Sequence, residues 1–218
     1  MSDDVTLYTY FRSSAAFRVR IALNLKAIKP ANRYIHLLKD GGQQFAEAYR
    51  SINPQALVPT LVDHDHPIQQ SLAIIEFLDE AYAEPPLLPE DKYGRARVRG
   101  LAYAIACDIH PINNLRVRKY LLKDMHHSEA EVLEWQRHWM RIGFEAIETM
   151  LAGDKRTGTF CHGDKPTLAD ICLIPQMANA RGAELDLSPY PTLKRIEKAA
   201  YDLSAFLDAL PKNQPDAE

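Results

Sequence analysis

The pattern of apolar positions divides the chain into two parts with different textures. Up to Tyr82, runs with a period of two alternate with runs of period about 3.6, which predicts strands and helices in turn. This alternation is typical of a layered α/β fold with crossover connections. The predicted strands are Val5–Tyr10, Arg33–Leu37, Thr60–Asp63 and Pro67–Gln69, the last two forming a hairpin, and the predicted helices are Ser14–Leu25, Gln43–Ser51 and Ser71–Tyr82.

Beyond Lys92 nearly every segment has the helical period. The proline-rich stretch Ala83–Asp91 lacks any period and marks a boundary. We therefore expect an α/β domain over residues 1–84, a linker over 85–91 and an all-α domain over 92–218. The predicted helices of the second part are Tyr93–Lys123, Glu129–Ala152, Thr167–Arg181, Thr192–Tyr201 and Ser204–Leu210.

Two features near helix ends refine this prediction. Thr167 and Asp170 have the spacing of a capping box, in which each side chain satisfies a backbone N–H at the start of a helix. Pro111 interrupts the long helix predicted for Tyr93–Lys123 and should kink it. The final residues, Lys212–Glu218, are expected to be frayed.

Composition excludes several classes of function. The 218 residues are 46% hydrophobic, enough to bury a full core, and 26 basic against 29 acidic residues leave no electrostatic footprint for nucleic acid or an anionic membrane. No apolar run approaches the ~20 residues that span a bilayer. The acidic start lacks the apolar region of a secretory signal, which favours a cytoplasmic protein. We expect Cys107, Cys161 and Cys172 to be small core residues, and we expect no metal site.

The most informative candidate for chemistry is the junction between the first strand and the first helix. Ser13 and Ser14 stand where the apolar period changes, so a helix begins where two hydroxyl groups lie. The first turn of a helix has unpaired N–H groups and a partial positive charge, and it can hold an anion such as a thiolate or carboxylate. The alternative is that Ser14 is only an N-cap.

Three further segments could contact a ligand. A cis bond between Val58 and Pro59 would expose backbone groups to an extended peptide-like ligand, although a trans proline is the commoner state. Gln70 and Ser71 precede another helix, where Ser71 is either part of a carboxylate site or a plain cap. His110, Asn113 and Asn114 surround Pro111, and form either a ligand contact or a satisfied polar cluster.

Together these segments resemble the zeta class of glutathione transferases, which includes maleylacetoacetate and maleylpyruvate isomerases. The resemblance covers essentially the whole chain, and each motif is weak alone, but their order and spacing are specific. It implies a thioredoxin-like N-terminal domain, an all-helical C-terminal domain, a homodimer and glutathione as cofactor. It rests on residues 10–14, 18–23, 39–45, 53–54, 58–61, 70–76, 87–89, 108–111, 167–170, 175–176 and 186–191.

The resemblance also implies roles for individual residues. Ser13 and Ser14 would face the glutathione sulfur and Val58 with Pro59 would clamp its cysteinyl backbone. Gln70 and Ser71 would bind the γ-glutamyl group, and Gln44 with His36 the glycyl end. Arg12 would bind a small dicarboxylic or keto-acid substrate and stabilise charge during its cis–trans isomerisation. His110, Asn113 and Asn114 complete the candidate cofactor contacts.

Two positions depart from the family pattern. Ala15 stands where a cysteine is usual, which glutathione can tolerate by supplying its own sulfur. Gly182 stands where the family has an arginine that grips the substrate, so Arg181 would have to replace it. Isomerisation is therefore the leading hypothesis. The alternatives are conjugation, α-halo-acid dehalogenation or peroxide reduction with the same cofactor, and a non-catalytic glutathione-fold binding protein.

Overall fold

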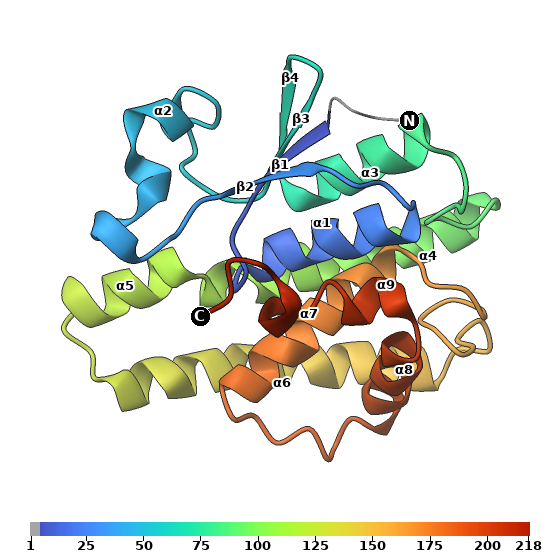
Figure 1. Ribbon diagram of the computed structural model, residues 1–218. Coiled ribbons are helices and arrows are strands. Elements are labelled where there is room, and N and C mark those ends of the chain that lie inside the picture. The colour runs from blue at the N-terminus through green and yellow to red at the C-terminus, as the bar shows by residue number, and fades with distance from the viewer. Residues whose placement is uncertain (1–4) are drawn as a thin grey trace. The chain divides into compact units, whose positions relative to one another are not determined.

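The computed structural model describes residues 5–218, which form two compact units (Figure 1). One unit contains the described residues up to Pro86 together with Leu203–Glu218, and the other contains Leu87–Asp202. The segment Leu203–Glu218 thus belongs to the α/β unit, whereas the sequence pattern grouped it with the helical domain.

The α/β unit is built on a four-stranded mixed sheet in the order β2-β1-β3-β4. The strand β1 (Val5–Thr9) pairs in parallel with β2 (Ala31–Tyr34) and antiparallel with β3 (Thr60–Asp63), which forms a hairpin with β4 (His66–Gln69). The helices α1 (Ser14–Leu25) and α3 (Ser71–Ala81) pack together beside the sheet (Figure 1). The thioredoxin-like α/β arrangement and the hairpin predicted from the sequence are confirmed.

Two predicted elements of this unit have different bounds in the structure. The strand β2 begins and ends earlier than expected, because β1 ends at Thr9 and the His36 Nδ1 then accepts the N–H groups of Leu38 and Lys39, which turns the chain. The helix predicted over Gln43–Ser51 is two short pieces, η2 (Gln43–Phe45) and α2 (Glu47–Arg50), separated by an extended residue at Ala46. A further 3₁₀ turn, η1, covers Lys39–Gly41.

The helix α1 is buried on almost all sides, with Arg18 and Arg20 only 1% and 6% exposed. Its far end is held by Lys26, whose ammonium group donates to the Asp79 carboxylate at 2.7 Å and to the carbonyl oxygens of Tyr82 and Pro85. All three N–H donors of the buried ammonium group are therefore satisfied, which links the C-terminal ends of α1 and α3.

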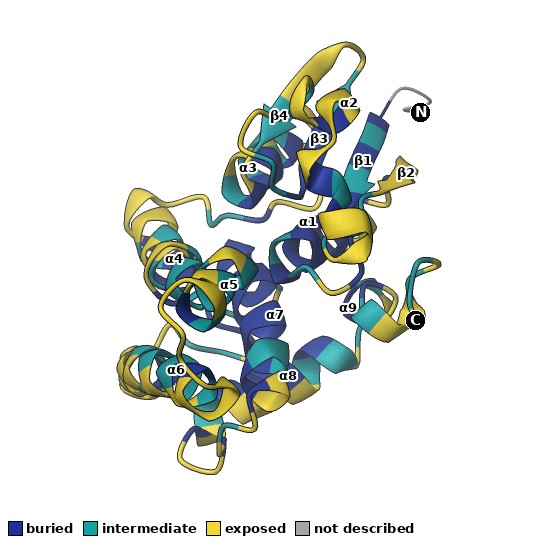
Figure 2. Cartoon of the chain, turned by 90° about the vertical axis from the view of Figure 1, so that its left-hand side faces the viewer, coloured by how far each residue is buried: buried dark blue, intermediate teal, exposed yellow. Residues whose placement is uncertain are grey.

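All regular secondary structure in the described residues of the second unit is helical. It contains α4 (Lys92–Tyr103), η3 (Ala104–Ile109), η4 (Pro111–Asn113), α5 (Leu115–Lys123), α6 (Glu129–Ala152), α7 (Leu168–Gly182) and α8 (Pro191–Tyr201). Figure 2 shows α7 as the most buried of them, and its residues 168–177 are all buried. Both α4 and α8 pack against α7, which forms the core of this unit.

The long helix predicted for Tyr93–Lys123 is broken rather than kinked. A π-helical turn, η3, precedes Pro111, and Asn114 then adopts an extended conformation and caps α5 by accepting the Arg116 N–H at 3.1 Å. Proline removes a helical donor and asparagine supplies a new cap, so one helix ends and another begins. In contrast, the bounds predicted for Ser14–Leu25 and Glu129–Ala152 are confirmed.

The end of the chain is ordered against the α/β unit, so the expectation of a frayed tail is wrong. The helix α9 (Ser204–Leu207) is shorter than predicted because Leu210 precedes a proline, a position that disfavours helical backbone. A 3₁₀ turn, η5 (Pro211–Asn213), follows, and the Gln214 side chain donates to the carbonyl oxygens of Asp208 and Leu210. One cysteine also differs from expectation: Cys107 is exposed, while Cys161 and Cys172 are buried.

Candidate glutathione site

The elbow between β1 and α1 has the geometry expected of an anion site, with one change. The N-cap of α1 is Ser13, not Ser14: its Oγ accepts the Ala16 N–H at 3.2 Å, and Ser14 is the first helical residue and is buried. A hydroxyl group has two acceptor lone pairs and one donor hydrogen. The capping bond uses an acceptor, so the Ser13 O–H can still donate to an anion at the helix terminus.

The next residue upstream of the serines is exposed. The guanidinium carbon of Arg12 lies 5.4 Å from the centre of the Phe11 ring, a cation–π contact that leaves its N–H groups available to a ligand. This position agrees with the predicted role of Arg12 as a charged group beside the serines.

The loop that carries Val58 and Pro59 is held by a buried polar cluster. The Val58–Pro59 peptide bond is cis, as the family resemblance implied. The carbonyl oxygen of Leu57 accepts from the Tyr49 hydroxyl at 2.5 Å and from the Asn53 Nδ2 at 2.9 Å. Both side chains also bond Thr60, and Val58 packs in one apolar cluster with Phe11 of the elbow. The clamp and the elbow are therefore neighbours.

The residues at the start of α3 also depart from ordinary capping. Gln70, not Ser71, is the N-cap, and it has a positive φ of 73° with no side-chain capping bond. Strained backbone of this kind is found most often at functional sites. The Ser71 Oγ accepts from the buried Arg18 at 3.3 Å, so α1 places a positive charge directly behind this helix terminus.

The predicted glycyl side contains one buried polar group without a partner. The Gln44 side chain is 5% exposed, and its Oε1 has no hydrogen-bond donor. Gly42 makes this arrangement possible, because a Cβ at that residue would lie 2.7 Å from the Gln44 amide. An unpaired buried acceptor is costly, and an N–H group of a peptide-like ligand would satisfy it.

His36 lies near this glutamine but has other partners. Its ring stacks edge-on against Tyr10 with 4.9 Å between ring centres, and its Nε2 lies 3.5 Å from the Glu218 carboxylate. Lys39 forms an ion pair with the same carboxylate. The Glu218 carboxylate thus lies beside both His36 and Lys39, and the role of His36 in binding the glycyl end stays a prediction.

Three predicted contacts belong to the helical unit. Asn114 is the cap of α5, and Asn113 donates to the Ile109 carbonyl oxygen at 3.1 Å while its Oδ1 is buried without a partner. Trp135 of α6 holds this segment by donating to the Ile112 carbonyl oxygen at 2.9 Å. The cap uses the Asn114 Oδ1, and the roles of His110, Asn113 and Asn114 in ligand binding stay predictions.

Arg181 has a partner that conflicts with its predicted role. Both of its terminal nitrogens bond the carboxylate of Glu197 on α8, which is 4% exposed. Glu197 raises the pKa of Arg181 by hydrogen bonding to its cation. Turning Arg181 toward a substrate would leave the buried Glu197 carboxylate without its partner, which would be costly.

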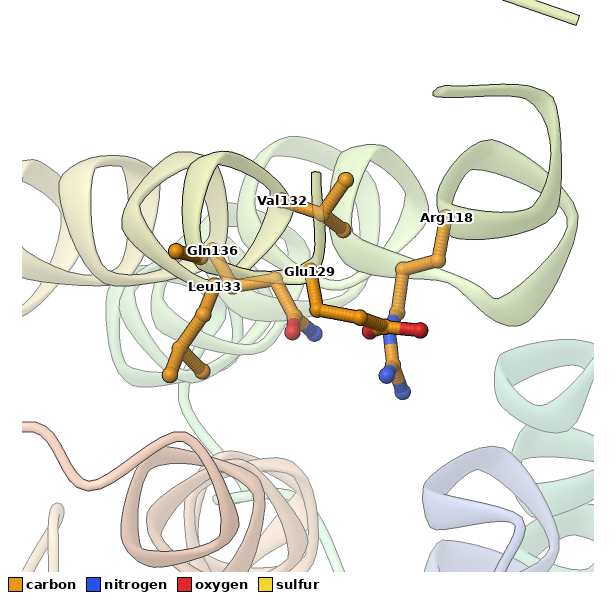
Figure 3. Close-up of a pocket in the computed structure, with 6 residues that line it drawn as sticks. Arg118, Glu129, Val132, Leu133 and Gln136 are labelled. Carbon is orange, nitrogen blue, oxygen red and sulfur yellow. The ribbon is translucent and has the colours of Figure 1, made fainter. Parts of the chain in front are cut away.

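A pocket between α5 and α6 is lined by residues that include Arg118, Glu129 and Leu133, and no predicted site residue lines it (Figure 3). Residues 5–218 contain no group of three or more His, Cys, Asp or Glu side chains placed to hold a metal ion. No helix among them is both long and apolar enough to cross a membrane.

Comparison with known proteins identifies the family. The family model described as "Glutathione S-transferase, N-terminal domain" matches residues 7–86. A probable maleylacetoacetate isomerase of Vibrio cholerae is 46% identical over 211 residues, which covers 97% of each chain. A holo structure of a maleylpyruvate isomerase, a bacterial zeta-class glutathione transferase, is 44% identical with a TM-score of 0.95, covering 98% of this chain and 100% of that one. This chain belongs to the zeta class of glutathione transferases.

A second solved structure of this class carries the cofactor. A maleylacetoacetate isomerase of Anaeromyxobacter dehalogenans, solved with glutathione bound in the active site, is 42% identical with a TM-score of 0.88 and covers 99% of this chain and 98% of its own. Glutathione as the cofactor of this zeta-class transferase agrees with the hydroxyl, the strained Gln70 and the unpaired Gln44 acceptor described above.

Sequence analysis assigned no individual role to four residues that support the candidate glutathione site, although three of them lie in motifs that carry the family resemblance. Arg18 and Arg20 lie in a helix whose other residues are mostly apolar, and charge alone suggested solvent exposure. Tyr49 lies in the predicted helix Gln43–Ser51 and Asn53 follows it, and no local pattern indicated that both bond the Leu57 carbonyl oxygen. A buried charge between apolar neighbours is the one signal in the sequence that could have indicated Arg18 and Arg20.

Proposed function

We propose that this protein catalyses the glutathione-dependent cis–trans isomerisation of maleylacetoacetate or maleylpyruvate. The observation that carries the proposal is the Ser13 hydroxyl at the N-terminus of α1, in a chain 46% identical to a probable maleylacetoacetate isomerase over nearly its full length. The bound cofactor supplies a thiolate that adds to the double bond and leaves again after rotation, which converts the cis acid into the trans acid.

The residues of the chain supply the electrostatics for this reaction. The Ser13 O–H donates to the sulfur anion, and the dipole of the helix α1 stabilises the same charge, so the thiolate is populated at neutral pH. Arg12 is exposed beside Ser13 and stabilises the negative charge that develops on the substrate. Gln70 and Ser71, with Arg18 behind them, bind the γ-glutamyl carboxylate at the start of α3.

Two other functions use the same cofactor site. Residue 182 is glycine, whereas the family resemblance implies an arginine there, and Arg181 bonds Glu197. Both observations favour a different substrate, such as a halo-acid or an electrophile for conjugation. A non-catalytic binding protein is the third possibility. By family resemblance we also propose a homodimer and a cytoplasmic location.

One assay separates these functions. The ultraviolet absorbance of maleylpyruvate or maleylacetoacetate is followed with and without glutathione, and we expect loss of the cis isomer only when glutathione is present. Turnover of a halo-acid or of chlorodinitrobenzene without isomerisation would show that the protein is a glutathione transferase with a different substrate. Glutathione binding by calorimetry without any turnover would leave only a binding role.

Restoring the arginine at residue 182 should increase isomerase activity. Gly182 is helical and exposed, and a Cβ there would meet nothing within 4 Å, so Gly182→Arg can be accommodated. A guanidinium–carboxylate bond contributes about 1.5–3 kcal/mol, so we expect kcat/KM for the maleyl acid to rise roughly tenfold or more. Steady-state kinetics measure this effect.

Gly182→Gln is the matched control, because it adds a long polar side chain without the charge. Equal kinetics for the two variants would show that residue 182 does not contact the substrate. Thermal unfolding of both variants should give midpoints no lower than that of the parent, since each replaces a helical glycine by a better helix former.

A further inference from the structure

The C-terminal segment lies against the elbow that carries the serines. The Asp216 Oδ2 accepts the backbone N–H of Phe11 at 2.9 Å, although the two residues are far apart in the sequence. Ala217 packs on the apolar cluster formed by Tyr10, Phe11, Tyr49 and Val58. Figure 1 shows this segment ending beside the loop between β1 and α1. The contact is therefore both polar and apolar.

Hydrogen bonds within the C-terminal segment fix its own conformation. The Gln214 Nε2 donates to the carbonyl oxygens of Asp208 and Leu210 at 2.8 and 3.0 Å, and the Ala217 N–H donates to the Gln214 carbonyl oxygen. These bonds form a compact turn after η5. Asp216 is thus presented to Phe11 by an ordered backbone.

A buried arginine binds the same elbow from inside the unit. The Arg20 guanidinium donates to the carbonyl oxygens of Tyr10 and Phe11 at 3.3 and 3.1 Å and to the Thr9 hydroxyl at 3.3 Å. Its Nε donates to the Ala209 carbonyl oxygen at 3.1 Å, which joins the elbow to the returning C-terminal segment. Burial lowers the pKa of Arg20 to about 10, so it remains a cation at neutral pH.

The peptide groups on either side of Phe11 are therefore bound by two opposite charges. Its N–H meets the Asp216 carboxylate, and its C=O meets the Arg20 guanidinium. Ser13 follows two residues later and donates its own N–H to the Tyr10 carbonyl oxygen at 3.0 Å, so its orientation depends on how this loop is held.

We infer that Asp216 is a positioning residue for the glutathione site, acting through the Phe11 N–H to hold Arg12 and Ser13 in their binding geometry. The inference rests on the proposed function, because it concerns the residues assigned to the thiolate. A hydroxyl that must point at one atom loses effect when its backbone moves by a fraction of an ångström. The role requires only a hydrogen-bond acceptor at Asp216, not a negative charge.

The test compares three variants of the full chain. Asp216→Ala removes the acceptor, and we expect kcat/KM for glutathione to fall about fivefold or more, with the acidic limb of its pH profile displaced to higher pH because the thiolate loses an aligned donor. Asp216→Asn keeps an oxygen that can accept the Phe11 N–H, so its kcat/KM for glutathione should lie within about twofold of the parent value. Asp208→Ala removes an exposed carboxylate from the same segment and should match the parent.

Each outcome decides the inference. If folded Asp216→Ala has the kinetics and pH profile of the parent, the inference is wrong. If Asp216→Ala has a lowered thermal midpoint, the kinetics of Asp216→Asn decide the question. Parent-like kinetics of Asp216→Asn support a positioning role. A folded Asp216→Asn that is as impaired as Asp216→Ala overturns the inference. A parent that neither binds glutathione in calorimetry nor isomerises a maleyl acid would overturn the proposed function and this inference with it. An active parent with an unaffected alanine variant overturns the inference alone.

Discussion

Replacing Ser13 by alanine should lower kcat for isomerisation by roughly 10²-fold, the usual cost of removing one donor to an anion in an active site. The Ser13 O–H is the donor available to the glutathione sulfur, since its capping bond to Ala16 uses only a lone pair. We expect a much smaller loss in glutathione affinity, because the other proposed contacts to the tripeptide are untouched. Stopped-flow kinetics and calorimetry measure the two effects separately.

The capping role of Ser13 requires a matched control. An N-cap serine replaced by alanine costs about 1 kcal/mol of stability, but replacement by glycine costs only a few tenths. Ser13→Gly and Ser13→Ala should therefore lose the same activity while differing in thermal midpoint, and Ser13→Thr should retain activity. If activity instead follows stability across the three variants, or if kcat and glutathione affinity fall equally, Ser13 is only a structural or binding residue.

Replacing Asp170 by alanine should cause a large loss of stability in the helical unit. Its carboxylate is fully buried and accepts the N–H groups of Cys161 and Thr167 and the Thr167 hydroxyl, each at 2.8 Å. A buried donor left without an acceptor costs about 1–3 kcal/mol, so the three together should lower the free energy of unfolding by about 3 kcal/mol or more. For a chain of this length the midpoint should fall by roughly 6–12 °C.

Asp164 offers an internal control for this effect. Its carboxylate also accepts a backbone N–H and a hydroxyl, both from Thr159, but it is exposed, so water can replace it. Asp164→Ala should therefore cost much less stability than Asp170→Ala. Urea unfolding measures both variants, and a similar small loss for Asp170→Ala would show that burial does not make this cap important.

The capping box itself illustrates what sequence could predict. Thr167 and Asp170 are three residues apart, and local spacing was enough to place the start of α7. The bond from Cys161 to the same carboxylate was not predictable, because it joins a loop residue that no local pattern connects to the helix. The capping box at Ser128 and Glu131 was missed, although its spacing was equally visible.

In the candidate site, too, the sequence predicted local features but not the contacts between distant residues. The serines were correctly assigned to a helix start, but the cap is Ser13, because the turn that ends β1 is closed by the Ser13 N–H bonding Tyr10. Arg181 was considered as a replacement for the arginine absent at residue 182, and only the structure shows that it bonds a glutamate on the next helix. The roles in glutathione binding predicted for His36, Gln44, Gln70 and Ser71 stay predictions.

By itself, the sequence determined the order of strands and helices, the elbow with its serines, the cis proline suggested by family resemblance and the family. These depend on neighbours within a few residues or on motifs kept in order along the chain. Only the tertiary structure decided that Arg20 and Asp216 hold the elbow from two sides, and that the C-terminal segment belongs to the α/β unit. Such contacts join residues distant in sequence, and burial and hydrogen bonding between them leave no periodic trace in the chain.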